Sequence, residues 1–222
     1  MKNEERRTTI RAQAALAAGF SFLILTSAAA QVKLEPAGAL QDPSAAPAIV
    51  KAVAPQGERV LLANGNPLCE IWLVSSAPER PAQDTEHTPY SGAFRPGAFL
   101  GVIRFPQRGR DFRGQPIKAG AYTLRYQTMP NDGNHMGVAP QRDFLLLLPL
   151  TRDTQTATIS SAGLLNASAS VSGTPHPAVF MLLPAQKGDL PRVYESPEGY
   201  VVFAGQAGSV PLALVVKGEA EQ

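Results

Sequence analysis

The loop at residues 131–137, NDGNHMG, carries the side chains best suited to bind a ligand. Asp132 supplies a carboxylate, Asn134 an amide, His135 an imidazole and Met136 a thioether. Glycines at 133 and 137 give this backbone unusual freedom. Loops held by a rigid scaffold are common sites of recognition. We therefore take these four side chains as candidate ligand-binding residues.

The same loop raises the hypothesis of a divalent metal site. Imidazole nitrogens and carboxylate oxygens are ligands of Zn²⁺ and similar ions, and His176, set between two prolines, could join His135 and Asp132 around one ion. Such an ion could support hydrolysis. The sequence has no H-x-H, H-E-x-x-H or C-x-x-C spacing. The alternative is therefore a polar hairpin loop with no cofactor.

A further pair of charges borders apolar segments. Asp143 directly precedes the run FLLLL at 144–148, and Arg125 lies on the polar side of the alternating segment AYTLRYQT at 121–128. An unpaired buried charge is costly. We expect Arg125 and Asp143 to meet across a sheet as a structural ion pair, and we keep both as ligand-binding candidates.

The densest basic run is formed by the arginines at 104, 108, 110 and 113. Arginine pairs with carboxylates or phosphates through two parallel hydrogen bonds, so an anion site is one interpretation, and a solvated hairpin end is the other. The net charge of the chain is only +2, and Phe105 and Phe112 are too few for a base-stacking platform. Nucleic acid is not an expected partner.

The motifs of several enzyme classes are missing from the sequence. It contains no G-x-S-x-G elbow, no G-x-x-x-x-G-K-[ST] loop and no G-x-G-x-x-G turn. Nucleophilic catalysis and nucleotide binding therefore have no support, and we expect binding more readily than catalysis.

Residues 1–30 have the organisation of a secretory signal. Basic side chains precede an uncharged stretch at 14–26, and small residues at 27–30 offer a cleavage site before Gln31. The alternative is an uncleaved membrane anchor. Removing the segment takes four basic and two acidic side chains, which leaves the rest neutral. We expect an exported protein, periplasmic or secreted, with no later membrane span.

The remaining sequence predicts an all-β fold. Residues 31–48 are rich in Ala and Pro and read as a linker, residues 49–217 as one domain, and 218–222 as a tail. Expected strands cover 49–53, 59–63, 68–74, 99–105, 121–128, 144–148, 178–183, 192–195, 200–204 and 210–216, with one helix at 160–171. Frequent turn residues favour an antiparallel β-sandwich, with a β-barrel as the alternative. The one cysteine, Cys69, lies in LCEIWLV at 68–74, where we expect it to be buried.

Residues 119–124, AGAYTL, resemble the AG-x-Y-x-L strand entry of exported bacterial β-sandwich domains of unknown function. The wider stretch from 100 to 148 is similar to secreted proteins of soil bacteria, and the likeness covers about a quarter of the chain. The resemblance implies an exported β fold and no activity. The residues themselves indicate a turn at Gly120 followed by inward-facing Tyr122 and Tyr126.

The functional prediction is a non-enzymatic module that binds a small ligand or an envelope protein through its loops. The loops concerned are residues 132–136 and the long polar segment 75–96, which exceeds the length of an ordinary hairpin connection. The metal site of His135, His176 and carboxylates is the alternative. A purely structural envelope component is the third.

Overall fold

The computed structural model describes residues 31–133, 135 and 137–218. The predicted signal, Asn134, Met136 and the last four residues lie outside the described residues. The elements within them are β1 (Lys33–Gly38), α1 (Pro47–Ala52), β2 (Gly57–Leu61), β3 (Pro67–Leu73), β4 (Phe99–Phe105), β5 (Gly109–Arg110), β6 (Pro116–Ile117), β7 (Gly120–Thr128), β8 (Asp143–Pro149), α2 (Ser161–Ser172), β9 (Val179–Leu183), β10 (Arg192–Glu195), β11 (Val201–Ala207) and β12 (Val210–Lys217).

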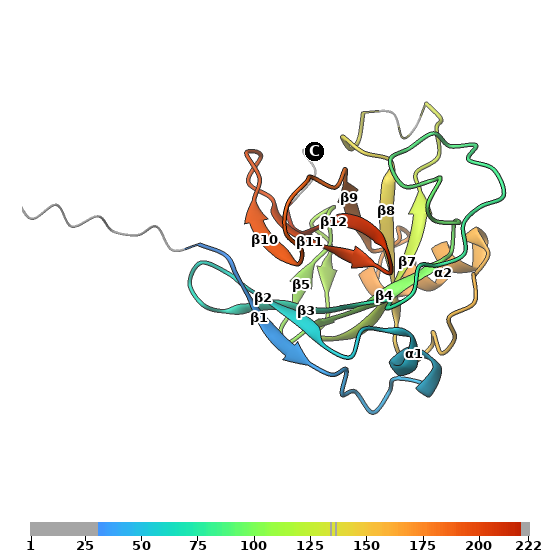
Figure 1. The fold of residues 1–222 in the computed structure, drawn as a ribbon. Coiled ribbons are helices and arrows are strands. Elements are labelled where there is room, and N and C mark those ends of the chain that lie inside the picture. Colours follow the sequence, from blue (N-terminus) through green and yellow to red (C-terminus); the bar gives the residue numbers. More distant parts are fainter. Residues whose placement is uncertain (1–30, 134, 136, 219–222) are drawn as a thin grey trace, which may run out of the picture.

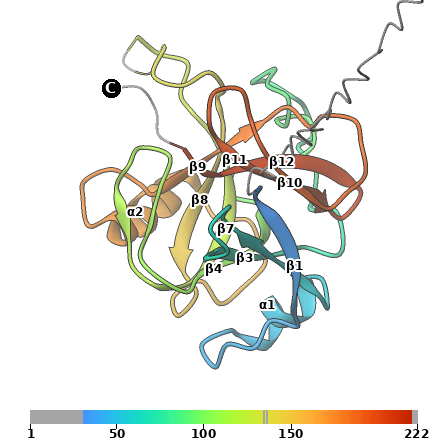
Figure 2. The ribbon, with the colours of Figure 1, turned by 90° about the vertical axis from the view of Figure 1, so that its left-hand side faces the viewer.

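Ten of these strands form one antiparallel sheet in the order β1-β2-β3-β4-β7-β8-β9-β12-β11-β10. The sheet curls until β1 and β10 approach each other, which makes a nearly closed barrel (Figure 1, Figure 2). The short strands β5 and β6 pair separately as a hairpin. The all-β prediction is confirmed, and the barrel alternative describes the arrangement better than two packed sheets because one sheet is continuous.

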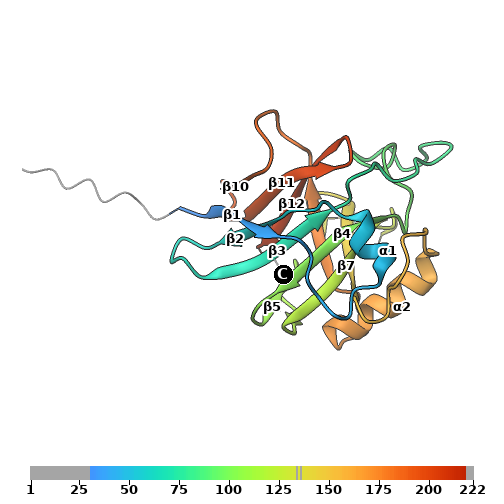
Figure 3. The same ribbon diagram turned by 60° about the horizontal axis from the view of Figure 1, so that its bottom comes forward.

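The barrel interior holds the main core. Along β7, Tyr122, Leu124 and Tyr126 point into it and are at most 7% exposed, as the alternation predicts. Gly120 opens β7 with a φ of +148°, a conformation that favours glycine. Trp72 on β3 donates its indole N–H to the carbonyl of Gly38 at 2.8 Å. This bond ties the end of β3 to the end of β1, across the neighbouring strands β1, β2 and β3 that Figure 3 shows side by side.

Strand β8 is covered on both faces, as its unbroken apolar run predicts. Leu145 and Leu147 pack in the interior, whereas Leu146 and Leu148 pack outside against Leu164 of α2. The helix lies along the outside of the barrel beside β8 (Figure 2). Helix α2 begins and ends within one residue of the predicted segment and terminates at a left-handed Gly173.

Two local predictions were wrong. The expected strand at 49–53 is the short helix α1, because Pro47 occupies its first turn and Ile49 and Val53 are buried at helical spacing while Val50 is exposed. The expected linker at 31–48 contains β1, which pairs with β2. The folded domain therefore begins near Lys33 rather than at residue 49.

Cys69 is a fully buried free thiol on β3, as expected. Desolvation raises its pKa above the ordinary thiol value. Neither helix in the part of the chain that the structure describes has the length and hydropathy of a membrane span.

Candidate functional site

A cleft of about 890 Å³ opens on the outside of the barrel. Its walls come from the end of β7, the start of β8, the start of β9 with the residues before it, helix α2, the tip of the β5–β6 hairpin and residues 129–139. Its apolar lining includes Phe112, Val138, Phe144, Leu146, Leu165 and Val179. A concave site of this volume with mostly apolar walls suits a small organic molecule.

The β5–β6 hairpin is fixed over the cleft by the carboxylate of Asp111, which is buried. This carboxylate accepts the backbone N–H groups of Arg113, Gln115 and Val179 at 2.8–3.2 Å, as well as the side-chain amide of Gln115. Burial raises the pKa of Asp111, and these donors oppose the rise. The hairpin is thereby attached to β9 and sets the Phe112 ring 6.2 Å from that of Phe144.

Two exposed apolar side chains line the cleft from separate segments of the chain. Val138 is 48% exposed and Leu165 is 40% exposed, and both line it. The neighbouring Leu164 is buried against β8, which fixes the rotation of α2 and leaves Leu165 at the cleft wall. Among the described residues the only other large apolar side chain with such exposure is Val50, on α1 and outside the cleft. Apolar exposure is thus concentrated at this site.

Every ionisable side chain that lines the cleft is basic. These are Arg113, His135 and His176, and no described carboxylate is among the lining residues. Asp132 stands beside the lining and contacts Nδ1 of His135 through Oδ1 at 2.7 Å. The Arg113 side chain is exposed and makes no ion pair with any described residue. The cleft therefore combines apolar walls with an available positive charge.

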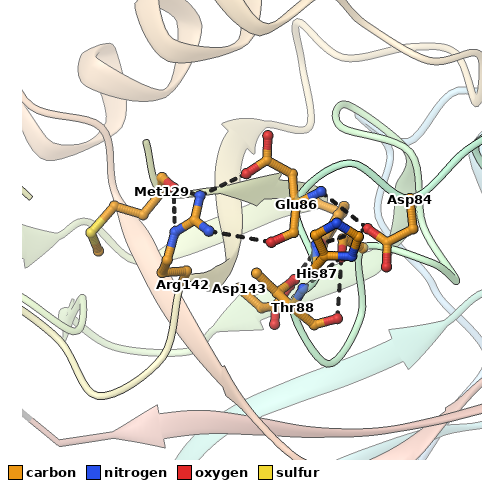
Figure 4. Close-up of polar contacts among 9 residues, drawn as sticks. Asp84, Glu86, His87, Thr88, Met129, Arg142 and Asp143 are labelled. Atoms are coloured by element: carbon orange, nitrogen blue, oxygen red, sulfur yellow. Dashed lines mark hydrogen bonds and ion pairs between the residues drawn. The ribbon is translucent and has the colours of Figure 1, made fainter. Parts of the chain in front are cut away.

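A second polar cluster lies close by on the inner side of β8 (Figure 4). Asp143 is fully buried, and its Oδ1 accepts hydrogen bonds from Tyr126 Oη at 2.5 Å and Thr88 Oγ1 at 2.6 Å. Its Oδ2 has no hydrogen-bond donor among the described residues. Desolvation raises the pKa of Asp143, whereas the two hydroxyl donors lower it by less.

The long segment 75–96 is fastened at this point. Arg142 donates to Glu86 Oε2 at 2.6 Å and to the carbonyl of Met129 at 2.8 and 3.0 Å (Figure 4). Asp84 Oδ1 accepts the backbone N–H groups of Glu86 and His87, and His87 adopts a φ of +52°. Segments 75–96 and 129–142 therefore lie together at one end of the barrel (Figure 1).

The predicted ion pair between Arg125 and Asp143 does not form. In the β7–β8 register Asp143 lies opposite Thr128, so its side chain points inward while that of Arg125 points outward. Arg125 instead pairs with Asp153, with Nη2–Oδ1 at 2.7 Å and Nε–Oδ2 at 2.8 Å, and both side chains are fully buried. Neither Arg125 nor Asp143 lines the cleft, so neither is a ligand-binding residue of this site.

The structure brings only part of the predicted site together. His135 and His176 line the same cleft, and Asp132 contacts His135. Asn134 and Met136 lie outside the described residues. No three described His, Cys, Asp or Glu side chains are grouped so as to hold one metal ion, so the zinc hypothesis gains no support.

Sequence reasoning missed the apolar walls, and it named Arg113 only as one member of a basic run that could form an anion site. The walls come from five separate stretches of sequence, and no local pattern reveals that they meet. These stretches are 112–113, 127–139, 144–146, 165–166 and 175–179. The basic run at 104–113 was the one available signal, and its members separate: Arg104 pairs with Glu70, Arg110 donates to the carbonyl of Gly114, and Arg113 lines the cleft.

We compared the chain with protein-family models, curated proteins and solved structures, and none of them matches it. The resemblance to exported domains carried by residues 119–124 stays a prediction, and function is argued from the site alone.

Proposed function

We propose that this chain is an exported, non-enzymatic binding protein whose outer cleft takes a small ligand with an apolar body. The observation that carries the proposal is the coincidence of three properties at one place: a concave volume of about 890 Å³, apolar walls, and two of the described chain's exposed large apolar side chains. Water contact of these side chains is unfavourable, and an apolar ligand would relieve it.

Binding is favoured over catalysis because the acid–base pair at the cleft, His135 with Asp132, has no serine or cysteine beside it among the described lining residues. No described carboxylate is among its lining residues, and the buried Asp143 beneath segment 75–96 is engaged with Tyr126 and Thr88. The one hydroxyl among the described lining residues belongs to Thr128, which is 7% exposed, and no described His, Cys, Asp or Glu side chains are grouped to hold a metal ion that could activate water.

The export part of the proposal rests on the pattern of residues 1–30. Expression with an epitope tag, followed by cell fractionation, tests it independently of binding. Recovery of the protein in the cytoplasm at full length would contradict export.

The neutral fluorophore N-phenyl-1-naphthylamine provides the binding test, because its emission rises in apolar sites. We expect saturable binding that Leu165→Glu weakens by about tenfold, since a half-exposed leucine contributes about 1–1.5 kcal/mol of contact and a carboxylate replaces it. Val50→Glu is the matched control: it changes a helical side chain of 42% exposure, against 40% for Leu165, outside the cleft. Equal affinity in the two variants would refute the cleft as the binding site.

A further inference from the structure

We infer that the ligand of this cleft is an amphiphile with a single anionic head group, such as a medium-chain carboxylate. This inference rests on the proposed function and names its ligand class. It starts from the charges at the cleft, which are Arg113, His135 and His176 with no described carboxylate in the lining.

Arg113 is the residue that would recognise the head group. Its backbone N–H is held by Asp111 at 2.9 Å, so the start of the side chain is fixed at the cleft rim while the guanidinium remains uncommitted among the described residues. A guanidinium binds a carboxylate through two parallel hydrogen bonds of well-defined geometry. Asp111, the one carboxylate of this hairpin, does not compete for the guanidinium, because backbone and amide donors occupy its oxygens.

The histidines add hydrogen-bond donors to the same site. A neutral imidazole still carries one N–H, so His176 can donate to an anion in either protonation state. His135 is held at Nδ1 by Asp132, which orients its ring. Asp132 also offsets positive charge on His135, and this leaves Arg113 as the main source of attraction.

The size and the walls of the cleft indicate the size and the apolar character of the ligand body. A volume of about 890 Å³ lies within the range of small-molecule sites, and it is bounded by Phe112, Phe144 and Leu165. An aliphatic or aromatic body would cover the exposed Val138 and Leu165 side chains, while the head group meets Arg113. A cationic or strongly polar ligand would gain nothing from this arrangement.

Competition against the neutral fluorophore tests the inference with decanoate, 1-decanol and decylammonium, each below its micelle concentration. We expect decanoate to compete far better than decylammonium. We expect Arg113→Gln to weaken decanoate by about tenfold, the loss of one charge-assisted interaction, and to leave decanol unchanged. The matched control is Arg108→Gln, an exposed arginine before the same hairpin that does not line the cleft.

The outcomes separate the two proposals. If Leu165→Glu leaves fluorophore binding intact, the proposed function fails. If the fluorophore occupies the cleft but decylammonium competes as well as decanoate, or Arg113→Gln weakens decanoate and decanol equally, only the anionic ligand class is overturned. An apolar hexapeptide that competes better than decanoate would overturn the small amphiphile in favour of a protein partner.

Discussion

Removing the carboxylate of Asp153 is expected to destabilise the fold more than any change at an exposed ion pair. Arg125 is fully buried and its five N–H groups meet five acceptors. These are the two carboxylate oxygens of Asp153 and the carbonyls of Gly97, Ala157 and Gln155. The Asp153→Ala change leaves the guanidinium charge buried and removes two of these acceptors.

The magnitude follows from burial. An uncompensated buried charge costs about 3–5 kcal/mol, and Asp153 also accepts the Thr123 hydroxyl at 2.5 Å. The pair Arg95–Glu79 gives the scale for exposed pairs: its side chains are 44% and 75% exposed, so Glu79→Ala should cost less than about 1 kcal/mol. The Arg125→Met/Asp153→Ala double variant should be more stable than Asp153→Ala alone, because it buries no unpaired charge.

Urea unfolding followed by the fluorescence of Trp72, the one tryptophan of the chain and fully buried, measures these differences. A loss below about 1 kcal/mol for Asp153→Ala would refute the reasoning, since it would equate the buried pair with an exposed one. A double variant whose loss of unfolding free energy equals the sum of the losses in the two single variants would refute the pairing itself.

Two further predictions concern the end of the barrel where segment 75–96 is fastened. Burial raises the folded-state pKa of Asp143 above its unfolded value of 3.8, so protonation of this carboxylate stabilises the folded state. That stabilisation is lost as the pH rises from the unfolded-state pKa through the folded-state pKa. In urea unfolding, the free energy of unfolding of Asp143→Asn should therefore rise relative to that of the unchanged chain between pH 4 and pH 7. A difference between the two that stays constant over this range would contradict the prediction. Arg142→Met removes a partly exposed ion pair with Glu86 and should speed amide exchange at residues 84–88 by about fivefold, with little change in global stability. Hydrogen-exchange mass spectrometry checks this, with Arg95→Met as the control on the same segment, and unchanged exchange at 84–88 would contradict the fastening role.

Local patterns located most of the strands and helix α2, but they missed β1, β5, β6 and α1. The alternation of 121–128 located β7 with its inward tyrosines, and the apolar run at 144–148 located a doubly covered strand. The run at 49–53 was misassigned because four apolar residues and one lysine show no period that separates a strand from a helical turn. In α1 the proline at position 47 decided the outcome.

Which charged side chains pair with each other was harder to predict than the secondary structure. Arg125 and Asp143 are both buried, but their side chains lie on opposite faces because the register sets Asp143 opposite Thr128. Residues 151–159 fold back over Arg125 and supply Asp153, and no pattern in the sequence announces this. The cleft was missed for the same reason: its walls are joined only by the tertiary fold.

The affinity of N-phenyl-1-naphthylamine for Leu165→Glu relative to Val50→Glu tests the central claim most directly. A ligand-binding cleft at α2 predicts binding about tenfold weaker in Leu165→Glu than in Val50→Glu. Equal affinities, with both variants folded, would contradict the account.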